Sequence, residues 1–116
     1  MKTSDRTILK KIHAEVLEID LIIKGCDLNS FIANTTIKKA VCMTLINIGE
    51  LIKHLSPELT KTNNHIPWKN ISGLRDVAAH SYSALRMEDI YTDAIENMPK
   101  FRKQIETVLN KSKSTL

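Results

Sequence analysis

Apolar residues recur every three or four positions through the first quarter of the chain, with charged residues between them. This spacing places the apolar side chains on one face of an α-helix. It predicts a helix that begins at Thr3 or Ser4 and ends at Gly25. Thr3 and Ser4 are both suitable N-caps, and the glycine supplies the stop. The apolar face comprises Ile8, Ile12, Val16, Ile19 and Ile23, widened by Leu9 and Leu17.

A second apolar stripe with the same period begins after a turn, where Asn29 can cap a short helical segment that ends at residue 32. The stripe predicts a long helix with Thr35 or Thr36 as its cap. Ser56-Pro57 either ends this helix or begins a short extra turn. The stripe comprises Ile37, Val41, Leu45, Ile48, Ile52 and Leu55.

Gly49 lies inside the second predicted helix. A glycine in a helix interior costs about 1 kcal/mol relative to alanine. Its presence therefore suggests that the backbone of another segment comes close at this point. Glu50 follows it, and the sequence leaves two placements open for this side chain: facing a cleft or dimer seam, or exposed to solvent.

A third long helix is predicted after the polar linker at residues 60–65. Ile66-Pro67-Trp68 marks its start, because proline is favoured at the first helical position. The helix is expected to end at about His80 or Tyr82. Its apolar positions fit a period of three and four, and Trp68 is expected to anchor the core rather than to stack on a base.

The last part of the chain predicts a helix over residues 87–97, a break or kink at Pro99, and a final helix over residues 100–109. The polar tail at residues 110–116 is expected to fray. The pattern as a whole predicts an all-α, four- to five-helix antiparallel bundle. We expect a single domain over residues 1–116, because 116 residues are too few for two hydrophobic cores.

Composition agrees with a small helical protein. Aromatic residues make up only 4% of the chain, which favours aliphatic helix packing, and the net charge of +4 is too small to identify a nucleic-acid partner by itself. Cys26 and Cys42 have no CxxC spacing, so we expect no metal site and no cofactor. No apolar run approaches the roughly 20 residues of a membrane span, and a cytoplasmic location without membrane contact is expected.

The candidate chemistry lies on the third predicted helix. Asp76 and His80 are four residues apart and about 40° apart around the helix axis, so their side chains can pair. Arg75 and Tyr82 are seven apart and also nearly superimpose, if the helix extends that far. Arg75 and His80 diverge by about 140°, so they can flank one groove without sharing a stripe. A second copy of the chain would complete such a site.

These residue types suit the cleavage of RNA without a metal. Histidine transfers protons near neutral pH, and arginine binds a phosphate and stabilises its developing charge. Asp76 is the supporting polar residue, because it can orient the imidazole of His80. Spacing alone also fits a plain surface pair of acid and histidine, since such pairs are common on helices.

The four residues belong to a longer pattern. Arg75-x4-His80-x-Tyr82 matches the R-x4-H-x-Y motif of HepT-type toxins in the HEPN superfamily, and the chain resembles that family over about residues 8–109. The motif alone is a weak signal, but it occurs together with three further blocks in the family's order. These blocks are Asn47-Ile48-Gly49-Glu50 with Lys53, Leu55 and Ser56; Ile66-Pro67-Trp68 with Gly73-Leu74-Arg75; and Met98-Pro99 with Ile105-Glu106.

The resemblance implies a two-fold homodimer with a metal-independent endoribonuclease site at its cleft. Arg75 and His80 would be catalytic toward an RNA substrate. The resemblance also implies a type VII-like toxin–antitoxin pair, in which a minimal nucleotidyltransferase antitoxin transfers AMP to Tyr82. Asp76 departs from the asparagine that often follows the motif's arginine, and its carboxylate would repel an RNA phosphate unless it is paired.

Two other functions remain open from the sequence. The first is a catalytically inactive dimer that binds a nucleotidyltransferase or a nucleotide, which the Asp76 departure favours. The second is a structural helical protein without a site, which the four matching blocks disfavour.

Overall fold

The computed structural model describes the backbone of residues 1–80 and 87–114 and the side chains of residues 1–79 and 87–111. The regular secondary-structure elements in this part of the chain are all helices, and none of them is a strand. They are α1 (Thr3–Ile23), α2 (Leu28–Ala33), α3 (Thr35–Lys53), α4 (Pro57–Thr62), α5 (Trp68–His80), α6 (Met87–Thr92), the π-helix η2 (Asp93–Asn97) and α7 (Met98–Ser114).

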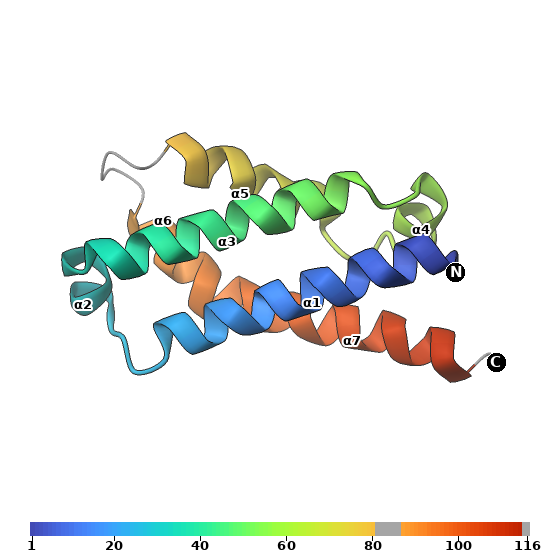
Figure 1. Cartoon of the computed structure of the whole chain (residues 1–116), viewed down its shortest axis with the longest axis horizontal. Helices are drawn as coiled ribbons and strands as arrows, with labels where there is room; N and C mark the ends of the chain where they lie inside the picture. Colours follow the sequence, from blue (N-terminus) through green and yellow to red (C-terminus); the bar gives the residue numbers. More distant parts are fainter. Residues whose placement is uncertain (81–86, 115–116) are drawn as a thin grey trace.

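The four long helices form an elongated antiparallel bundle with extents of 47 × 25 × 20 Å (Figure 1). Helix α3 lies between α1 and α5, and α7 packs along the other side of α1. Each of these neighbours runs in the opposite direction (Figure 1). The predicted all-α antiparallel bundle is therefore confirmed. No described helix has the length and apolar character that crossing a bilayer requires.

The apolar stripes predicted from the sequence form most of the core. Ile12, Val16, Ile19 and Ile23 of α1 are buried. Leu17 was expected to widen this stripe, but its side chain is 38% exposed. Leu9, which was also expected to widen the stripe, is fully buried. Cys42 is buried in α3 as a small core residue. The largest fully buried side chains are Phe31, Phe101, Leu9, Ile12 and Ile19.

The predicted N-caps of the first three helices were wrong. Lys2 occupies the cap position of α1 and makes no side-chain cap bond. Asp27 caps α2 by accepting from the Ser30 amide at 2.8 Å, and Asn34 caps α3 by accepting from the Ile37 amide at 3.0 Å. Each cap comes earlier than predicted, and for α2 and α3 the upstream Asp and Asn are acceptors at least as good as the predicted residues. The predicted stop is confirmed, since Gly25 has a φ of +74°.

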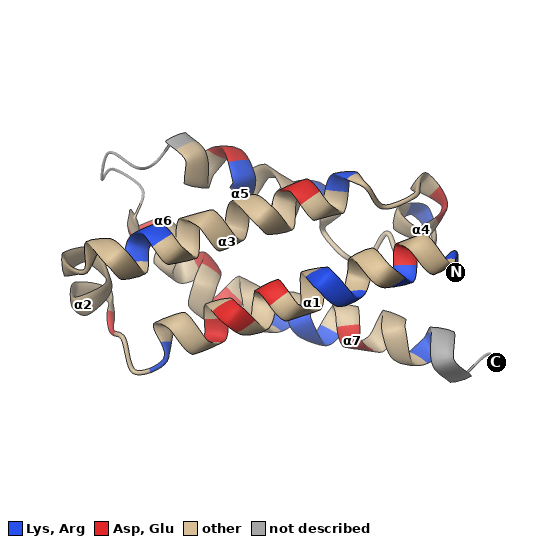
Figure 2. Ribbon diagram, viewed as in Figure 1, with Lys and Arg blue, Asp and Glu red and all other residues tan. Residues whose placement is uncertain are grey.

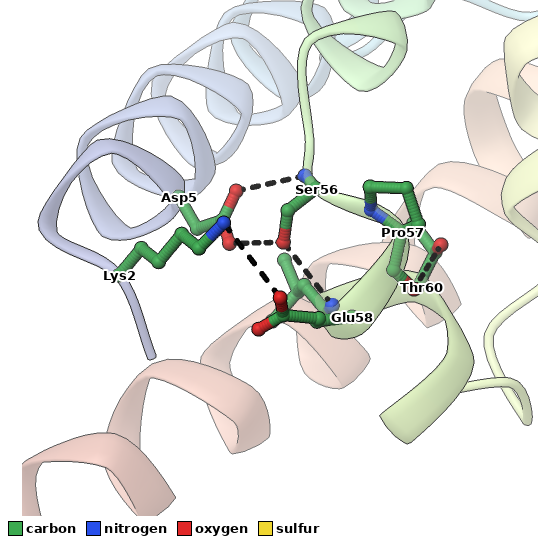
Figure 3. Close-up of polar contacts among 7 residues, drawn as sticks. Lys2, Asp5, Ser56, Pro57, Glu58 and Thr60 are labelled. Carbon is green, nitrogen blue, oxygen red and sulfur yellow. Dashed lines mark hydrogen bonds and ion pairs between the residues drawn. The ribbon is translucent and has the colours of Figure 1, made fainter.

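Asp5 connects the start of α1 to the start of α4 (Figure 3). Its carboxylate is buried and accepts hydrogen bonds from the Ser56 amide at 2.9 Å and from the Ser56 hydroxyl at 2.6 Å. Ser56 in turn caps α4 by accepting from the Leu59 amide at 3.3 Å. The Ser56-Pro57 turn thus begins a short helix, which extends to Thr62 and takes in part of the predicted linker.

Pro99 does not break the chain's last helical stretch. The turn before it widens into η2, in which the Met98 amide bonds to the Asp93 carbonyl, five residues back. Proline has no amide hydrogen to donate, and a π-turn accommodates the resulting shift in hydrogen-bond register. Helix α7 then extends to Ser114, beyond the end expected near Leu109, because none of the residues between is a glycine or proline.

Candidate functional site

Helix α5 carries the candidate motif, and its first residue fixes it to the bundle. The Pro67 carbonyl accepts from the Ile71 amide at 3.0 Å, so the proline precedes the helix by one residue instead of occupying the first helical position. Trp68 is buried, its indole N–H donates to the Asn63 carbonyl at 3.1 Å, and its ring meets Phe101 edge-on at 5.9 Å. The expectation that Trp68 anchors the core is confirmed.

The helices α3 and α5 lie close together at Gly49. A Cβ atom added to this glycine would lie 2.6 Å from Cβ of Arg75 and 3.0 Å from the Ser72 carbonyl oxygen. The expected close approach of another segment is therefore confirmed, and the segment is the middle of α5. The absence of a side chain at Gly49 lets the motif helix lie directly against α3.

This close approach places Arg75 beside Glu50. The Arg75 Nε atom and a Glu50 carboxylate oxygen form an ion pair at 2.5 Å. The same oxygen lies 4.0 Å from Lys53 Nζ, three residues further along α3. The side chains of Arg75 and Glu50 are 35% and 44% exposed, so the pair lies at the surface, within reach of a ligand. Glu50 is thus partly exposed and also faces the motif helix, and its placement at a cleft or dimer seam remains a prediction.

The structure describes Asp76 completely, only the backbone of His80, and nothing of Tyr82. Asp76 is exposed, and Arg75 pairs with Glu50 rather than with it. His80 is the last residue of α5, so the 75–80 segment is helical and the backbone directions of Arg75 and His80 diverge by about 140°. The His80 side chain and the whole of Tyr82 lie outside the described residues. The predicted Asp76–His80 and Arg75–Tyr82 pairs therefore remain predictions.

A groove of about 380 Å³ adjoins the ion pair between α1 and α3. Glu50 belongs to both the groove and the Arg75 pair. The remaining lining residues are Lys11, Ala14, Glu15, Asn47 and Leu51. Both charge signs occur along α1, α3 and α5, as Figure 2 shows, so the mild positive charge of the chain does not form one uniform basic face in this view. Among the described residues, no three side chains of the metal-ligating types gather into a possible metal site.

A comparison with known protein families identifies the family to which the chain is related. Residues 12–108 match the family described as Ribonuclease HepT-like. The chain belongs to the HepT-like family. The match covers α5 together with α3, the helix that packs against it. The resemblance to HEPN-superfamily proteins of the HepT type is confirmed.

Similar proteins span most of the chain. A protein of Caldanaerobacter subterraneus subsp. tengcongensis, provisionally named as an RNase, is 30% identical over 113 residues, which are 97% of this chain and all of that protein. A Methanocaldococcus jannaschii protein with the same provisional name is 32% identical over 85 residues, 73% of this chain and 78% of its own length. A protein of Thermococcus cleftensis described as a probable ribonuclease HepT is 23% identical over 106 residues, 91% of this chain and 96% of its own. No solved structure gives a significant match.

Glu50 is the site residue that the sequence did not assign. Its position next to a glycine inside a helix was the available signal, but a single chain does not reveal which segment approaches that glycine. The contact with Arg75 appears only when α3 and α5 are packed together.

Proposed function

We propose that this HepT-like protein is the toxin of a type VII-like toxin–antitoxin pair and cleaves RNA in the cytoplasm without a metal ion. The observation that carries the proposal is the pairing of a ribonuclease family match with an accessible arginine at the motif. Among the described residues, Glu50 pairs with Arg75 through Nε, and in this proposal the two Nη groups bind a phosphate. RNA is the substrate that the family's description implies.

The proposed reaction is a transesterification at one phosphodiester. His80 accepts the proton of the ribose 2′-hydroxyl, the 2′-oxygen forms a bond to phosphorus, and the bond from phosphorus to the 5′-oxygen breaks. The departing 5′-oxygen takes up a proton from a general acid, and a second His80 in a two-fold homodimer supplies that acid. Arg75 binds the non-bridging phosphate oxygens and stabilises their growing charge.

The second part of the proposal concerns neutralisation. A minimal nucleotidyltransferase antitoxin transfers AMP from ATP to the Tyr82 hydroxyl and releases pyrophosphate. An adduct at this position adds a bulky anion two residues from His80, where it competes with the RNA phosphate. Mass spectrometry of the protein made with and without its partner tests this step: the added mass of one AMP on Tyr82 is expected only with the partner, and tight binding without added mass would favour steric neutralisation.

The cleavage itself is tested on purified protein in EDTA. We expect wild-type protein to cut RNA, and His80→Ala to lose this activity while it keeps its helical circular dichroism signal. Sedimentation of the wild-type protein should give the mass of a dimer. A folded dimer that leaves every RNA intact, together with a His80→Ala variant that relieves no growth defect, would remove the ribonuclease proposal.

The second candidate is a catalytically inactive dimer that binds a nucleotidyltransferase or a nucleotide. The exposed carboxylate of Asp76 beside Arg75 favours it, because a negative charge there opposes the approach of a phosphate. The substitution Asp76→Asn separates the two functions. If the protein cleaves RNA, Asp76→Asn should bind RNA more tightly than the cleaving wild type. If the protein is an inactive module, neither the wild type nor Asp76→Asn should cleave RNA.

A further inference from the structure

The contact between Glu50 and Arg75 has a geometry that suits orientation rather than stability. Both side chains are more than one-third exposed, and ion pairs in such positions contribute little to folding. The carboxylate oxygen nevertheless meets one particular nitrogen, Nε, of the guanidinium group. This nitrogen is the donor nearest the side-chain stem, so a partner there fixes the direction in which the rest of the planar group points.

The surroundings hold the carboxylate in place. Glu50 lies within α3, and its neighbour Gly49 is in contact distance of the α5 backbone at Ser72. The positions of the two Cα atoms that carry Glu50 and Arg75 are therefore set by helix packing and not by loops. Lys53 approaches the same carboxylate oxygen from the next turn and partly offsets its charge.

We propose that Glu50 is a positioning residue for Arg75, whose Nε it holds so that the two Nη groups are presented to the scissile phosphate. This inference rests on the proposed ribonuclease function. The guanidinium has five N–H donors, and a partner on Nε leaves the four on the Nη atoms for the bidentate contact that arginine makes with phosphate. Glu50 contacts no reacting atom in this role and acts through Arg75 alone.

A positioning role predicts opposite effects on turnover and on RNA binding. Loss of the Glu50 carboxylate frees Arg75 to adopt several rotamers, and misplacement of a phosphate-binding group lowers kcat. The same change removes a negative charge from the surface that RNA approaches, so the KM for RNA should fall or stay constant. A residue that merely supported the fold would not separate these two parameters.

The test uses Glu50→Ala and Glu50→Gln, with Glu15→Gln as the matched control. Glu15 lines the same groove and loses the same charge, but it does not pair with Arg75. We expect kcat to fall about tenfold in Glu50→Ala. Glu50→Gln should lose less, because its amide oxygen can still accept from Nε, and Glu15→Gln should keep the wild-type kcat. If Glu50→Ala and Glu15→Gln have the same kcat as the wild type, the inference is overturned.

A measurement that needs no activity keeps the inference separate from the proposed function. The Nε–H resonance of Arg75, assigned by its absence in Arg75→Lys, should exchange slowly with water in the wild type. It should exchange at least several-fold faster in Glu50→Ala, which removes the acceptor, with the thermal midpoint of unfolding changed by less than about 2 °C. A wild-type protein that shows this protection but cuts no RNA would remove the ribonuclease and keep the positioning contact. Equal exchange rates in the two proteins would overturn the contact itself, whatever the activity.

Discussion

The substitution Gly49→Ala tests the packing that brings Arg75 to Glu50. The new Cβ atom would lie 2.6 Å from Cβ of Arg75, 3.0 Å from the Ser72 carbonyl oxygen and 3.6 Å from Cα of Arg75. These atoms belong to the α5 backbone or are attached directly to it, so a side-chain rotation cannot relieve the contact. Carbon atoms pack best at about 3.5–4.0 Å, so α5 has to move away from α3 by about 1 Å.

The expected cost follows from two opposing effects. Overpacking of this kind destabilises a protein by about 1–3 kcal/mol. Alanine gains about 1 kcal/mol over glycine inside a helix. The net loss in the free energy of unfolding is then about 0–2 kcal/mol. A displacement of about 1 Å at Arg75 also predicts a fall in RNA cleavage of up to about 10²-fold.

Gly73→Ala is the matched control for this experiment. Gly73 also lies inside a helix, but a Cβ atom added there meets no described atom within 4 Å. It should therefore show the helix gain of about 1 kcal/mol without the clash. The helix gain cancels in the difference between the two variants, which leaves about 1–3 kcal/mol.

Thermal and urea unfolding followed by circular dichroism measure this difference. At one protein concentration, the midpoint for Gly49→Ala should lie roughly 4–12 °C below that for Gly73→Ala, since 1 kcal/mol corresponds to about 4 °C in a domain of this size. If both variants are stabilised by the same amount, α5 does not lie against Gly49 and the described geometry of the Arg75 site is wrong.

Three further predictions concern other parts of the bundle. Asp5→Ala should cost about 1–3 kcal/mol in urea unfolding, because it leaves the partly buried hydrogen-bond donors of Ser56 unpaired, and it should leave RNA cleavage intact. A neutral effect would contradict the Asp5–Ser56 connection. Burial raises the pKa of the Asp93 carboxyl above its ordinary 3.8; a hydrogen bond from Asn97 opposes this shift, and the charge of Asp89 adds to it. The folded state therefore binds the proton of Asp93 more tightly than the unfolded state does. The stability that this group contributes falls as the pH rises from 3.8 through the folded pKa. Asp93→Asn should then be more stable than wild type at neutral pH and lose this advantage near pH 3.8 in thermal unfolding, whereas a pH-independent difference would contradict it. Burial also raises the pKa of the Cys42 thiol, so iodoacetamide should alkylate the partly exposed Cys26 first, as followed by peptide mass spectrometry; equal rates would contradict the placement of Cys42 in the core.

Hydrophobic periodicity predicted the helices well because burial against a bundle imposes a regular pattern. The stripes of α1 and α3 correspond to faces that are buried in the structure, except that Ile8 and Ile37 are only partly buried and Leu17 is exposed. Apolar periodicity alone does not say which edge of a wide stripe faces solvent, and that choice depends on where α7 and α3 lie around α1.

Local capping was predicted less well, since several good acceptors follow one another at each helix start. Asp27 and Asn29 are equally suitable by residue type, and Asn34 and Thr35 are both favoured cap residues. The backbone decides between them: Asp27 and Asn34 are the residues with extended conformations directly before the first helical turn.

Contacts between distant parts of the chain were beyond the reach of a single sequence. Asp5 and Ser56 are 51 residues apart, and nothing in their local sequence indicates that they meet. The Glu50–Arg75 pair is of the same kind. The sequence did indicate Arg75 as a site residue and Gly49 as a point of close approach, but only the packing of α3 against α5 joins these two observations.

The most direct test of the proposed chemistry is the role of the ribose 2′-hydroxyl. An RNA that the wild-type protein cuts in EDTA is synthesised again with a single 2′-deoxynucleotide on the 5′ side of the scissile phosphate. We predict that cleavage at this bond is lost, that the unmodified RNA yields a 2′,3′-cyclic phosphate, and that His80→Ala and Arg75→Ala leave the unmodified RNA intact. Cleavage of the deoxy-substituted bond at the wild-type rate, or a His80→Ala variant as active as the wild type, would contradict the proposed mechanism.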